Sequence, residues 1–188
     1  MRDPQESLAM HATAPEPHSK TVPEHVDPDS GARHAVPTLT AGAASASREE
    51  VLAALNELLE AERAGARVTM ETARDIPPSE LATLVHDIHK DEVRWCSMLM
   101  RTIKALEGTS SSATGAFWGK AMAIPDVEQR LSFLNRGQAW GVRRLQALIP
   151  RVHEAQIRAD LVTMLEAHTK NIERVEARTS GEQGAERD

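Results

Sequence analysis

Four long stretches of the chain repeat apolar residues every three or four positions, the spacing that places side chains on one face of an α-helix. They span residues 48–74, 79–107, 126–148 and 154–178. No stretch of useful length alternates apolar and polar residues as a half-buried strand would. The pattern predicts an all-α fold in which four amphipathic helices pack their apolar faces together.

The boundaries of these helices carry recognisable signals. Ser47 and Glu50 form a capping-box pattern just before the first apolar stripe, and the pair Pro77-Pro78 separates the first helix from the second. Residues 108–125 make the longest connection. Short links within each pair and a long link between the pairs predict two antiparallel helical hairpins joined by a crossover, a four-helix bundle.

One polar residue interrupts the apolar stripe of each helix near its middle. These residues are Glu62, Glu92, Gln138 and His168. Glu92 follows Glu62 by 30 positions, and His168 follows Gln138 by the same 30. Equal offsets in two hairpins are typical of an internal duplication, so we expect the four side chains to meet at one level inside the bundle. A buried charge is costly unless it is paired or binds a metal, which makes this level the candidate site.

Several segments resemble the ferritin-like superfamily of the bacterioferritin and rubrerythrin type. Residues 55–62 are similar to the first helix of bacterioferritins, and 91–95 align with the Glu-x-x-His motif of the second. Residues 127–149 align with the third helix and 168–173 with the fourth. The run 133–138 also resembles an uncharacterised bacterial branch of the superfamily. The resemblance implies a ferritin-like bundle over residues 48–178.

The resemblance also implies that the two-metal carboxylate site of that superfamily is altered. Trp95 stands at the position of the first motif histidine, and Gln138 at that of the third-helix glutamate. His168 replaces the fourth-helix glutamate, and Asn171 replaces the second motif histidine. Only two of the six ligand positions, Glu62 and Glu92, keep the residue of the family.

The remaining donors suit one metal ion better than two. Two carboxylates and one imidazole can bind a single Fe, Mn or Zn ion and leave coordination positions open for oxygen or a small-molecule substrate. The expected ligand set is Glu62, Glu92, His168 and Gln138, with His89 and Asn171 as second-rank candidates. This reading predicts an oxidase or oxygenase type of chemistry, for which the sequence identifies no catalytic residue or substrate.

A metal-free alternative stays open. The inward glutamates and His168 can instead form a hydrogen-bonded network with Arg136, Gln138 and Asn171. The chain would then be a non-catalytic helical module that dimerises and binds a partner. In both readings Trp95 is expected to fill the core and Cys96 to be a small buried apolar residue.

Charge and composition exclude several other classes. The formal net charge of −6 gives no broad basic surface for nucleic acid. Cys96 is the only cysteine, so the chain can form no internal disulfide, as expected for a cytoplasmic protein. No window approaches the eighteen or more apolar residues of a spanning helix, so no membrane association is expected.

The first 47 residues differ from the rest in composition. They hold six of the ten prolines and four of the eight histidines, with few clustered apolar residues. Such a segment cannot bury enough apolar surface to offset its ordering entropy, so residues 1–47 are predicted to be a disordered tail. Residues 179–188 are predicted to be disordered as well.

Overall fold

The structure is a computed structural model that describes residues 45–185, with side chains described for 45–178. The chain divides into two units, Met1–Thr40 and Ala41–Asp188. The first unit lies outside the described residues, and so does nearly all of the predicted tail. Everything below concerns the second unit.

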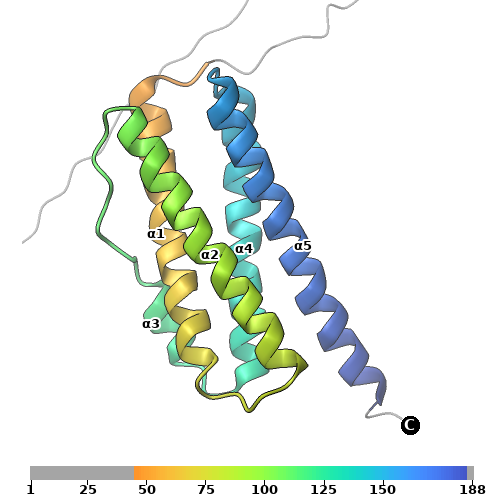
Figure 1. The fold of residues 1–188 in the computed structure, drawn as a ribbon. Coiled ribbons are helices and arrows are strands. Elements are labelled where there is room, and N and C mark those ends of the chain that lie inside the picture. The colour runs from red at the N-terminus through yellow and green to blue at the C-terminus, as the bar shows by residue number, and fades with distance from the viewer. Residues whose placement is uncertain (1–44, 186–188) are drawn as a thin grey trace, which may run out of the picture. The chain divides into compact units, whose positions relative to one another are not determined.

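Five α-helices and one short 3-10 helix make up the described part of the chain (Figure 1). In chain order they are α1 (Arg48–Thr72), α2 (Glu80–Ala105), α3 (Phe117–Met122), α4 (Val127–Leu148), η1 (Ile149–Arg151) and α5 (Ala155–Ala185). The described residues contain no strand, so the all-α prediction is confirmed. The six-residue α3 was not predicted, and α5 continues past the expected end at 178.

The four long helices lie side by side (Figure 1). α1 packs against α2 and α4, and α5 packs against α4 and α2. Consecutive long helices run in opposite directions, and the connection after α2 returns along the outside of α1 to reach α3. This connection places α3 between α1 and α4, both of which it contacts.

Side-chain caps fix where the helices begin. Ser47 Oγ accepts a hydrogen bond from the Glu50 backbone N–H at 3.2 Å, and the Glu50 carboxylate accepts one from the Ser47 N–H at 2.8 Å. The predicted capping box is therefore confirmed. Asp126 caps α4 in the same way through the Gln129 N–H, at 2.8 Å. These bonds satisfy backbone donors that have no partner inside the helix.

Gly108, just after the end of α2, lies very close to α1. The positive φ angle of this turn belongs to Glu107, not to Gly108. Glu107 takes the positive φ of 53°, and Gly108 follows it, donating its N–H to the Ile103 carbonyl at 2.8 Å. A Cβ on Gly108 would lie 2.4 Å from a Leu52 methyl group. A side chain at residue 108 would therefore force the Leu52 side chain to move.

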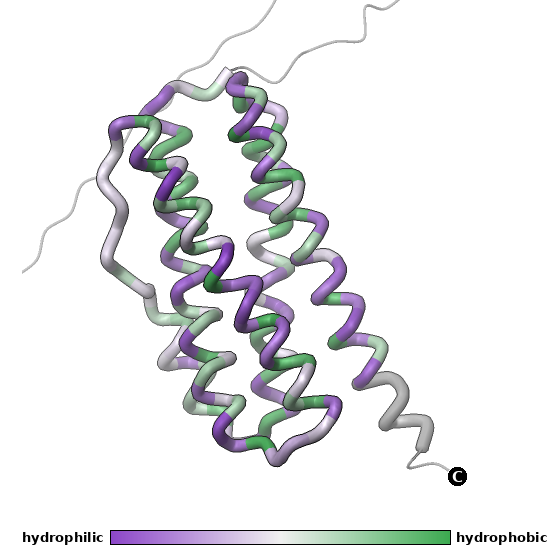
Figure 2. The backbone as a smooth tube through the Cα atoms, in the orientation of Figure 1, coloured by the Kyte–Doolittle hydropathy of each residue, from purple (hydrophilic) through white to green (hydrophobic). Residues whose placement is uncertain are grey.

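The interior contains two apolar clusters. The first is built around Leu55, Leu59, Leu99, Leu145 and Leu161. The second is built around Val68, Val85, Ile88, Leu131 and Val175. Hydrophilic segments separate the hydrophobic ones along the helices (Figure 2). The residue numbers place a polar layer between the two clusters, half-way along each long helix.

A buried arginine joins the ends of α1 and α4 beside the second cluster. Arg130 is 4% exposed, and its guanidinium lies 2.7 Å from the Asp75 carboxylate. It also donates to the carbonyl groups of Ile124 and Pro125 at 3.0 and 3.3 Å. These contacts fix the chain as it enters α4.

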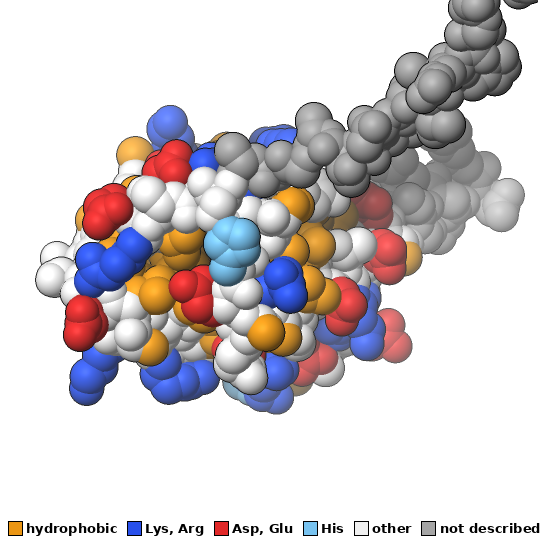
Figure 3. Space-filling view, turned by 90° about the horizontal axis from the view of Figure 1, so that it is seen from above, with side chains coloured by type: hydrophobic (Ala, Val, Ile, Leu, Met, Phe, Trp, Pro, Cys, Tyr) orange, Lys and Arg blue, Asp and Glu red, His pale blue; other side chains and the backbone are white. Residues whose placement is uncertain are grey.

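The outer surface mixes both signs of charge. The end-on view shows acidic and basic side chains interspersed among apolar ones on the face it presents (Figure 3). No helix among the described residues is both long enough and apolar enough to cross a membrane.

Candidate functional site

Four polar side chains form the layer between the two apolar clusters, one from each long helix. Their exposed fractions are 3% for Glu62 on α1, 3% for Glu92 on α2, 5% for Gln138 on α4 and 2% for His168 on α5. The prediction that all four point inward is confirmed. Because a helix rises about 1.5 Å per residue, equal spacing in each hairpin brings them to one level.

Two hydrogen bonds connect the layer across the helices. His168 Nε2 lies 3.0 Å from Glu62 Oε1, and the Gln138 amide donates to Glu92 Oε1 at 3.0 Å. Three polar atoms of this layer are buried without a hydrogen-bond partner: Glu62 Oε2, Gln138 Oε1 and His168 Nδ1. Unsatisfied buried polar atoms are rare in folded proteins, and several in one layer indicate a site that receives a further group.

Burial shifts the pKa values of the ionisable groups in the layer toward their uncharged forms. Burial raises the pKa of Glu62 to about 8. Burial raises the pKa of Glu92 as well, and the nearby Glu62 charge adds to this effect. Burial lowers the pKa of His168, against the opposing pull of Glu92 and Asp91. Among the described residues, neither Glu62 nor Glu92 forms an ion pair with a lysine or arginine.

A cavity of about 490 Å³ reaches this layer from the surface. The four polar side chains line its buried end, whereas Arg136 and Trp140, both exposed, line its open end. Its walls are mainly apolar and come from α1, α4, the start of α3 and the residues just before it; they include Ala61, Phe117, Phe133 and Leu134. The cavity therefore joins an apolar entrance to a polar base.

Three glycines on facing helices leave room for the cavity and its base. A Cβ on Gly65 would lie 2.4 Å from Glu92 Oε2, and one on Gly137 would lie 2.7 Å from the Phe117 ring. A Cβ on Gly141 would sit 3.4 Å from the His168 ring, which is ordinary contact. Gly65 thus lets the Glu92 carboxylate approach α1, and Gly137 lets the Phe117 ring lie against α4.

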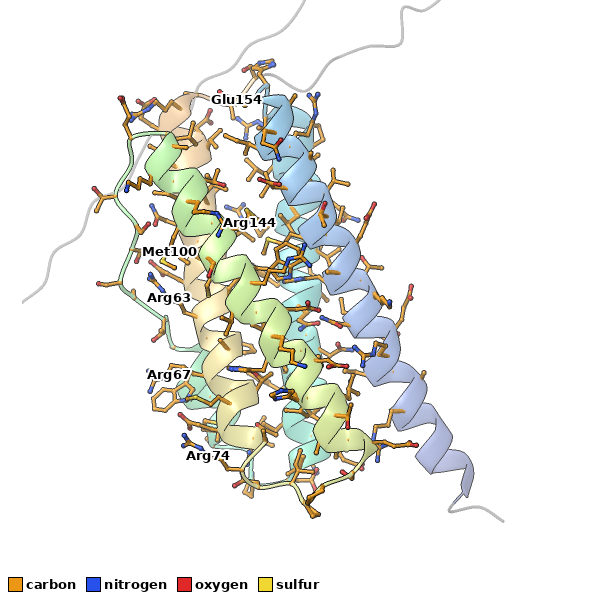
Figure 4. The ribbon with its side chains drawn as sticks, viewed as in Figure 1. Arg63, Arg67, Arg74, Met100, Arg144 and Glu154 are labelled. Atoms are coloured by element: carbon orange, nitrogen blue, oxygen red, sulfur yellow. The ribbon has the colours of Figure 1, made fainter. Side chains whose placement is uncertain are left out.

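Arginines of α1 hold the segment that forms the cavity wall (Figure 4). Arg63 donates to the Ser111 carbonyl and to the Met100 sulfur, the latter at 3.5 Å. One turn further on, the Arg67 guanidinium lies 3.9 Å from the centre of the Trp118 ring. These contacts fix both ends of the segment that carries Phe117.

The charged groups at the entrance already have partners. The Glu57 carboxylate pairs with Arg144, which is labelled in Figure 4. The Glu60 carboxylate accepts a hydrogen bond from the Ser111 hydroxyl. Arg136 lies over the Phe133 ring at 5.2 Å and forms no ion pair with another described residue.

The second-rank candidates lie outside the cavity. His89 Nδ1 is 3.0 Å from the Ala66 carbonyl and 3.1 Å from the Thr69 hydroxyl, at the contact between α1 and α2. Asn171 is buried and donates to Asp91 at 3.0 Å. Neither side chain lines the cavity. Arg136, expected to join the buried network, is instead at the entrance.

Trp95 and Cys96 belong to the first apolar cluster, as expected. The Trp95 indole is 2% exposed and its N–H has no hydrogen-bond partner, so this ring fills the place beside Glu92 at the cost of an unsatisfied donor. Burial raises the pKa of the Cys96 thiol to about 12, with Glu62 and Glu92 adding to the shift. Cys96 is therefore an unreactive core residue.

Sequence reasoning missed the aromatic wall of the cavity. Phe117 and Phe133 stack with ring centres 4.9 Å apart, and Trp140 completes the entrance. A usable signal was present on α4, where Gly137 and Gly141 leave one helix face without side chains immediately beside Gln138. Phe117 carried no such signal, because its segment has no periodic pattern.

The layer does not already have the arrangement of a metal centre. Among the described residues, no group of three or more His, Cys, Asp and Glu side chains is placed to hold a metal ion. The hydrogen bond between Glu62 and His168 explains this in part, because it turns two expected donors toward each other.

Comparison with known proteins gives one family. The family model described as "Domain of unknown function (DUF6306)" matches residues 49–177, so the chain belongs to this family. No curated protein and no solved structure gives a significant match. The description of the family names no activity, and the function must be argued from the site.

Proposed function

We propose that this member of the DUF6306 family is a ferritin-like four-helix bundle that binds one divalent metal ion, Fe, Mn or Zn, through Glu62, Glu92 and His168. The observation that carries the proposal is the pair of buried carboxylates at the end of a cavity, without a lysine or arginine partner among the described residues. Buried carboxylates are stable as charges only when a cation is near, and a metal ion supplies one.

The helix arrangement supports the ferritin-like part of the proposal. Ferritin-like bundles have two antiparallel hairpins, one long crossover and a metal site at mid-height built from inward side chains of all four helices. The present chain has four long helices, a long connection after α2 and one inward polar residue at the middle of each helix. The sequence resemblance points to the same superfamily.

The donor set fits a single ion in its chemistry. Two carboxylates and one imidazole are ligands that Fe(II), Mn(II) and Zn(II) accept. Binding through Glu62 Oε1 or through His168 Nε2 requires the 3.0 Å hydrogen bond between them to open. The structure then corresponds to the hydrogen-bonded form of the site.

The residues of the layer have distinct roles in this proposal. An ion in this place would supply open coordination positions for oxygen or a substrate oxygen atom, as in oxidase or oxygenase chemistry. Glu62 and Glu92 release their protons when the ion binds, because their raised pKa values keep them protonated without it. Gln138 fixes the orientation of Glu92 through its amide hydrogen bond.

Calorimetric titration tests the proposal directly. Chelator-treated full-length protein is titrated separately with Fe(II), Mn(II) and Zn(II), and the Fe(II) titration is done under anaerobic conditions. We expect one ion per chain and at least a hundredfold weaker binding in the Glu62→Gln, His168→Ala double variant. Circular dichroism shows whether the variant keeps its helices.

Matched controls separate this site from other sites on the chain. His89→Ala and Asn171→Ala change buried or half-buried polar residues of α2 and α5 that do not line the cavity. They should bind the ion as the parent does. Equal affinity in the parent and the double variant would place the ion elsewhere and overturn the proposed ligand set.

A second candidate is favoured by the present arrangement of the donors. Because no described group of three such side chains is placed for a metal, the layer also supports a metal-free helical module that binds a partner as a dimer in the cytoplasm. Absence of binding for all three metals would select this candidate.

A further inference from the structure

We propose that the cavity above the polar layer binds a small uncharged aromatic molecule of the phenol class, with its ring between Phe117 and Trp140 and its hydroxyl group at the polar base. The assignment names the substrate class of the proposed metal site and rests on that proposal for any chemistry. Binding of the molecule itself needs only the cavity, so the two ideas can fail separately.

The size of the cavity suits a small organic molecule. Ligand pockets have volumes of about 300–1,000 Å³, and this cavity has about 490 Å³. One aromatic ring with a short substituent fits in that space together with water. The cavity is much larger than an ion or a dioxygen molecule needs, so the layer alone does not account for it.

The walls favour a flat apolar body. Phe117 and Phe133 form a stacked pair with 22° between their planes, and the far edge of the Phe117 ring approaches α4 at Gly137, which has no side chain. Trp140 lines the same cavity from α4 and is 37% exposed, a large value for a tryptophan. Aromatic rings pack against other rings in offset or edge-on contacts that aliphatic molecules do not make.

The charges at the entrance favour an uncharged ligand. Arg144 pairs with Glu57, and the Ser111 hydroxyl donates a hydrogen bond to the Glu60 carboxylate. Arg136 lies over the Phe133 ring. A ligand with a carboxylate would pass Glu57 and Glu60 on its way to the base, and an ammonium ion would meet Arg136. Among the described residues, no charged group lies within the apolar part of the wall.

The base of the cavity contains a buried hydrogen-bond acceptor that lacks a donor. Gln138 Oε1 is buried and has no partner, although the other end of the same amide is fixed by Glu92. Glu62 Oε2 is buried and unpartnered as well. A ligand hydroxyl group could donate to the Gln138 oxygen, whereas a hydrocarbon would leave it unsatisfied, which is costly.

Saturation-transfer NMR and calorimetry test the proposal with phenol, toluene and benzoate on chelator-treated full-length protein. Phenol should bind with a dissociation constant at or below the millimolar range. Toluene, which lacks the donor, should bind about fivefold more weakly, and benzoate weaker still. In Gln138→Leu the advantage of phenol over toluene should disappear.

Two wall variants locate the binding site. Ala61→Leu adds volume to the cavity wall and should weaken phenol binding at least tenfold, whereas Ala53→Leu, at an exposed position of the same helix, should not. If Ala61→Leu loses its helical signal, Trp140→Ala replaces it, because Trp140 is partly exposed. Loss of binding is expected in either cavity variant.

Several results would overturn the inference. The first is undetectable binding of phenol at 10 mM, a concentration roughly ten times the expected upper range for a small fragment. The second is benzoate binding as tight as phenol binding. The third is unchanged phenol binding in Ala61→Leu or Trp140→Ala. Phenol binding by a protein that takes up no metal would refute the proposed metal site and leave this inference intact. Metal binding without phenol binding would refute this inference and leave the proposed metal site intact.

Discussion

His168 Nε2 and Glu62 Oε1 lie 3.0 Å apart, although 106 positions separate the two residues in the chain. The contact joins α5 to α1 across the polar layer, with both side chains almost completely buried. The contact also turns His168 Nε2 and Glu62 Oε1 toward each other rather than toward a common point. The site therefore has a closed, hydrogen-bonded form, and an added cation must compete with this contact.

The buried carboxylates make the stability of the metal-free protein depend on pH. Glu62 has a pKa of about 8 when folded and the ordinary value of 4.5 when unfolded. The folded state therefore keeps a proton that the unfolded state has lost, and stability falls as pH rises between these values, by up to about 1.4 kcal/mol per pH unit for each such group. Glu92 acts in the same direction.

Urea unfolding of chelator-treated protein at pH 6.5 to 8 measures this effect. His168 opposes it only below its ordinary pKa of 6.5, because its pKa is lowered in the folded state. We expect the free energy of unfolding to decrease through this range, and Glu62→Gln to show a shallower decrease. A parent protein that gains stability toward pH 8 would contradict the pKa directions.

Metal affinity should depend on pH in the opposite sense. Because the ion displaces protons from Glu62 and Glu92, its apparent affinity should rise from pH 6.5 to 8, with protons released on binding. Calorimetry in two buffers of different ionisation enthalpy counts these protons. An affinity independent of pH in this range would mean that the ligands are already ionised.

Gly65→Ala should damage the site although alanine favours a helix. Alanine gains up to about 1 kcal/mol in helix propensity over glycine. Its Cβ would lie 2.4 Å from the Glu92 carboxylate, a clash that forces a shift and costs typically about 1–3 kcal/mol. We expect a lower melting temperature and loss of metal binding. Gly119→Ala, where a Cβ meets nothing within 4 Å, is the matched control and should keep metal binding without lowering the melting temperature.

Arg130 should matter more for stability than its ion-pair partner. Arg130→Ala removes the buried guanidinium together with its bonds to Ile124 and Pro125, and should lower the free energy of unfolding by about 3 kcal/mol, because hydrogen bonds from a charged donor are worth about 1.5–3 kcal/mol each. Asp75 is half exposed, so Asp75→Asn should lower the free energy of unfolding by less. Denaturant titrations of both variants compare these losses, and a larger loss for Asp75→Asn would be inconsistent with the structure.

Cys96 should react slowly with thiol reagents in the folded protein. Its pKa of about 12 leaves almost no thiolate at pH 8, and the sulfur is buried beside the polar layer. Labelling with iodoacetamide should be at least a hundredfold slower in native protein than in denatured protein. Rapid labelling of the native form would show that the first apolar cluster opens readily.

The sequence predicted the helices and the polar layer because both follow from helical periodicity. A helix is stiff and regular, so four polar residues at equal offsets must lie near one level once the helices pack. The predicted limits of the first three long helices agree with the structure within a few residues. Periodicity does not determine the hydrogen-bond partner of a side chain. Asn171, for example, donates to Asp91 and does not line the cavity.

The cavity could not be predicted in the same way. Its wall depends on Phe117, which lies in the connection after α2, where the sequence has no repeating pattern. Its position is set instead by distant contacts, such as that of Arg67 with Trp118. The empty space itself depends on Gly137 facing that ring, a relation between two segments that only the folded chain reveals.

Elemental analysis of the purified full-length protein tests the central claim most directly. The protein is produced in cells supplied with iron, manganese and zinc, and the metal content is measured per chain beside the Glu62→Gln, His168→Ala variant. The proposal predicts about one ion per chain in the parent and almost none in the variant. A value near zero in the parent, or equal values in the two proteins, would contradict it.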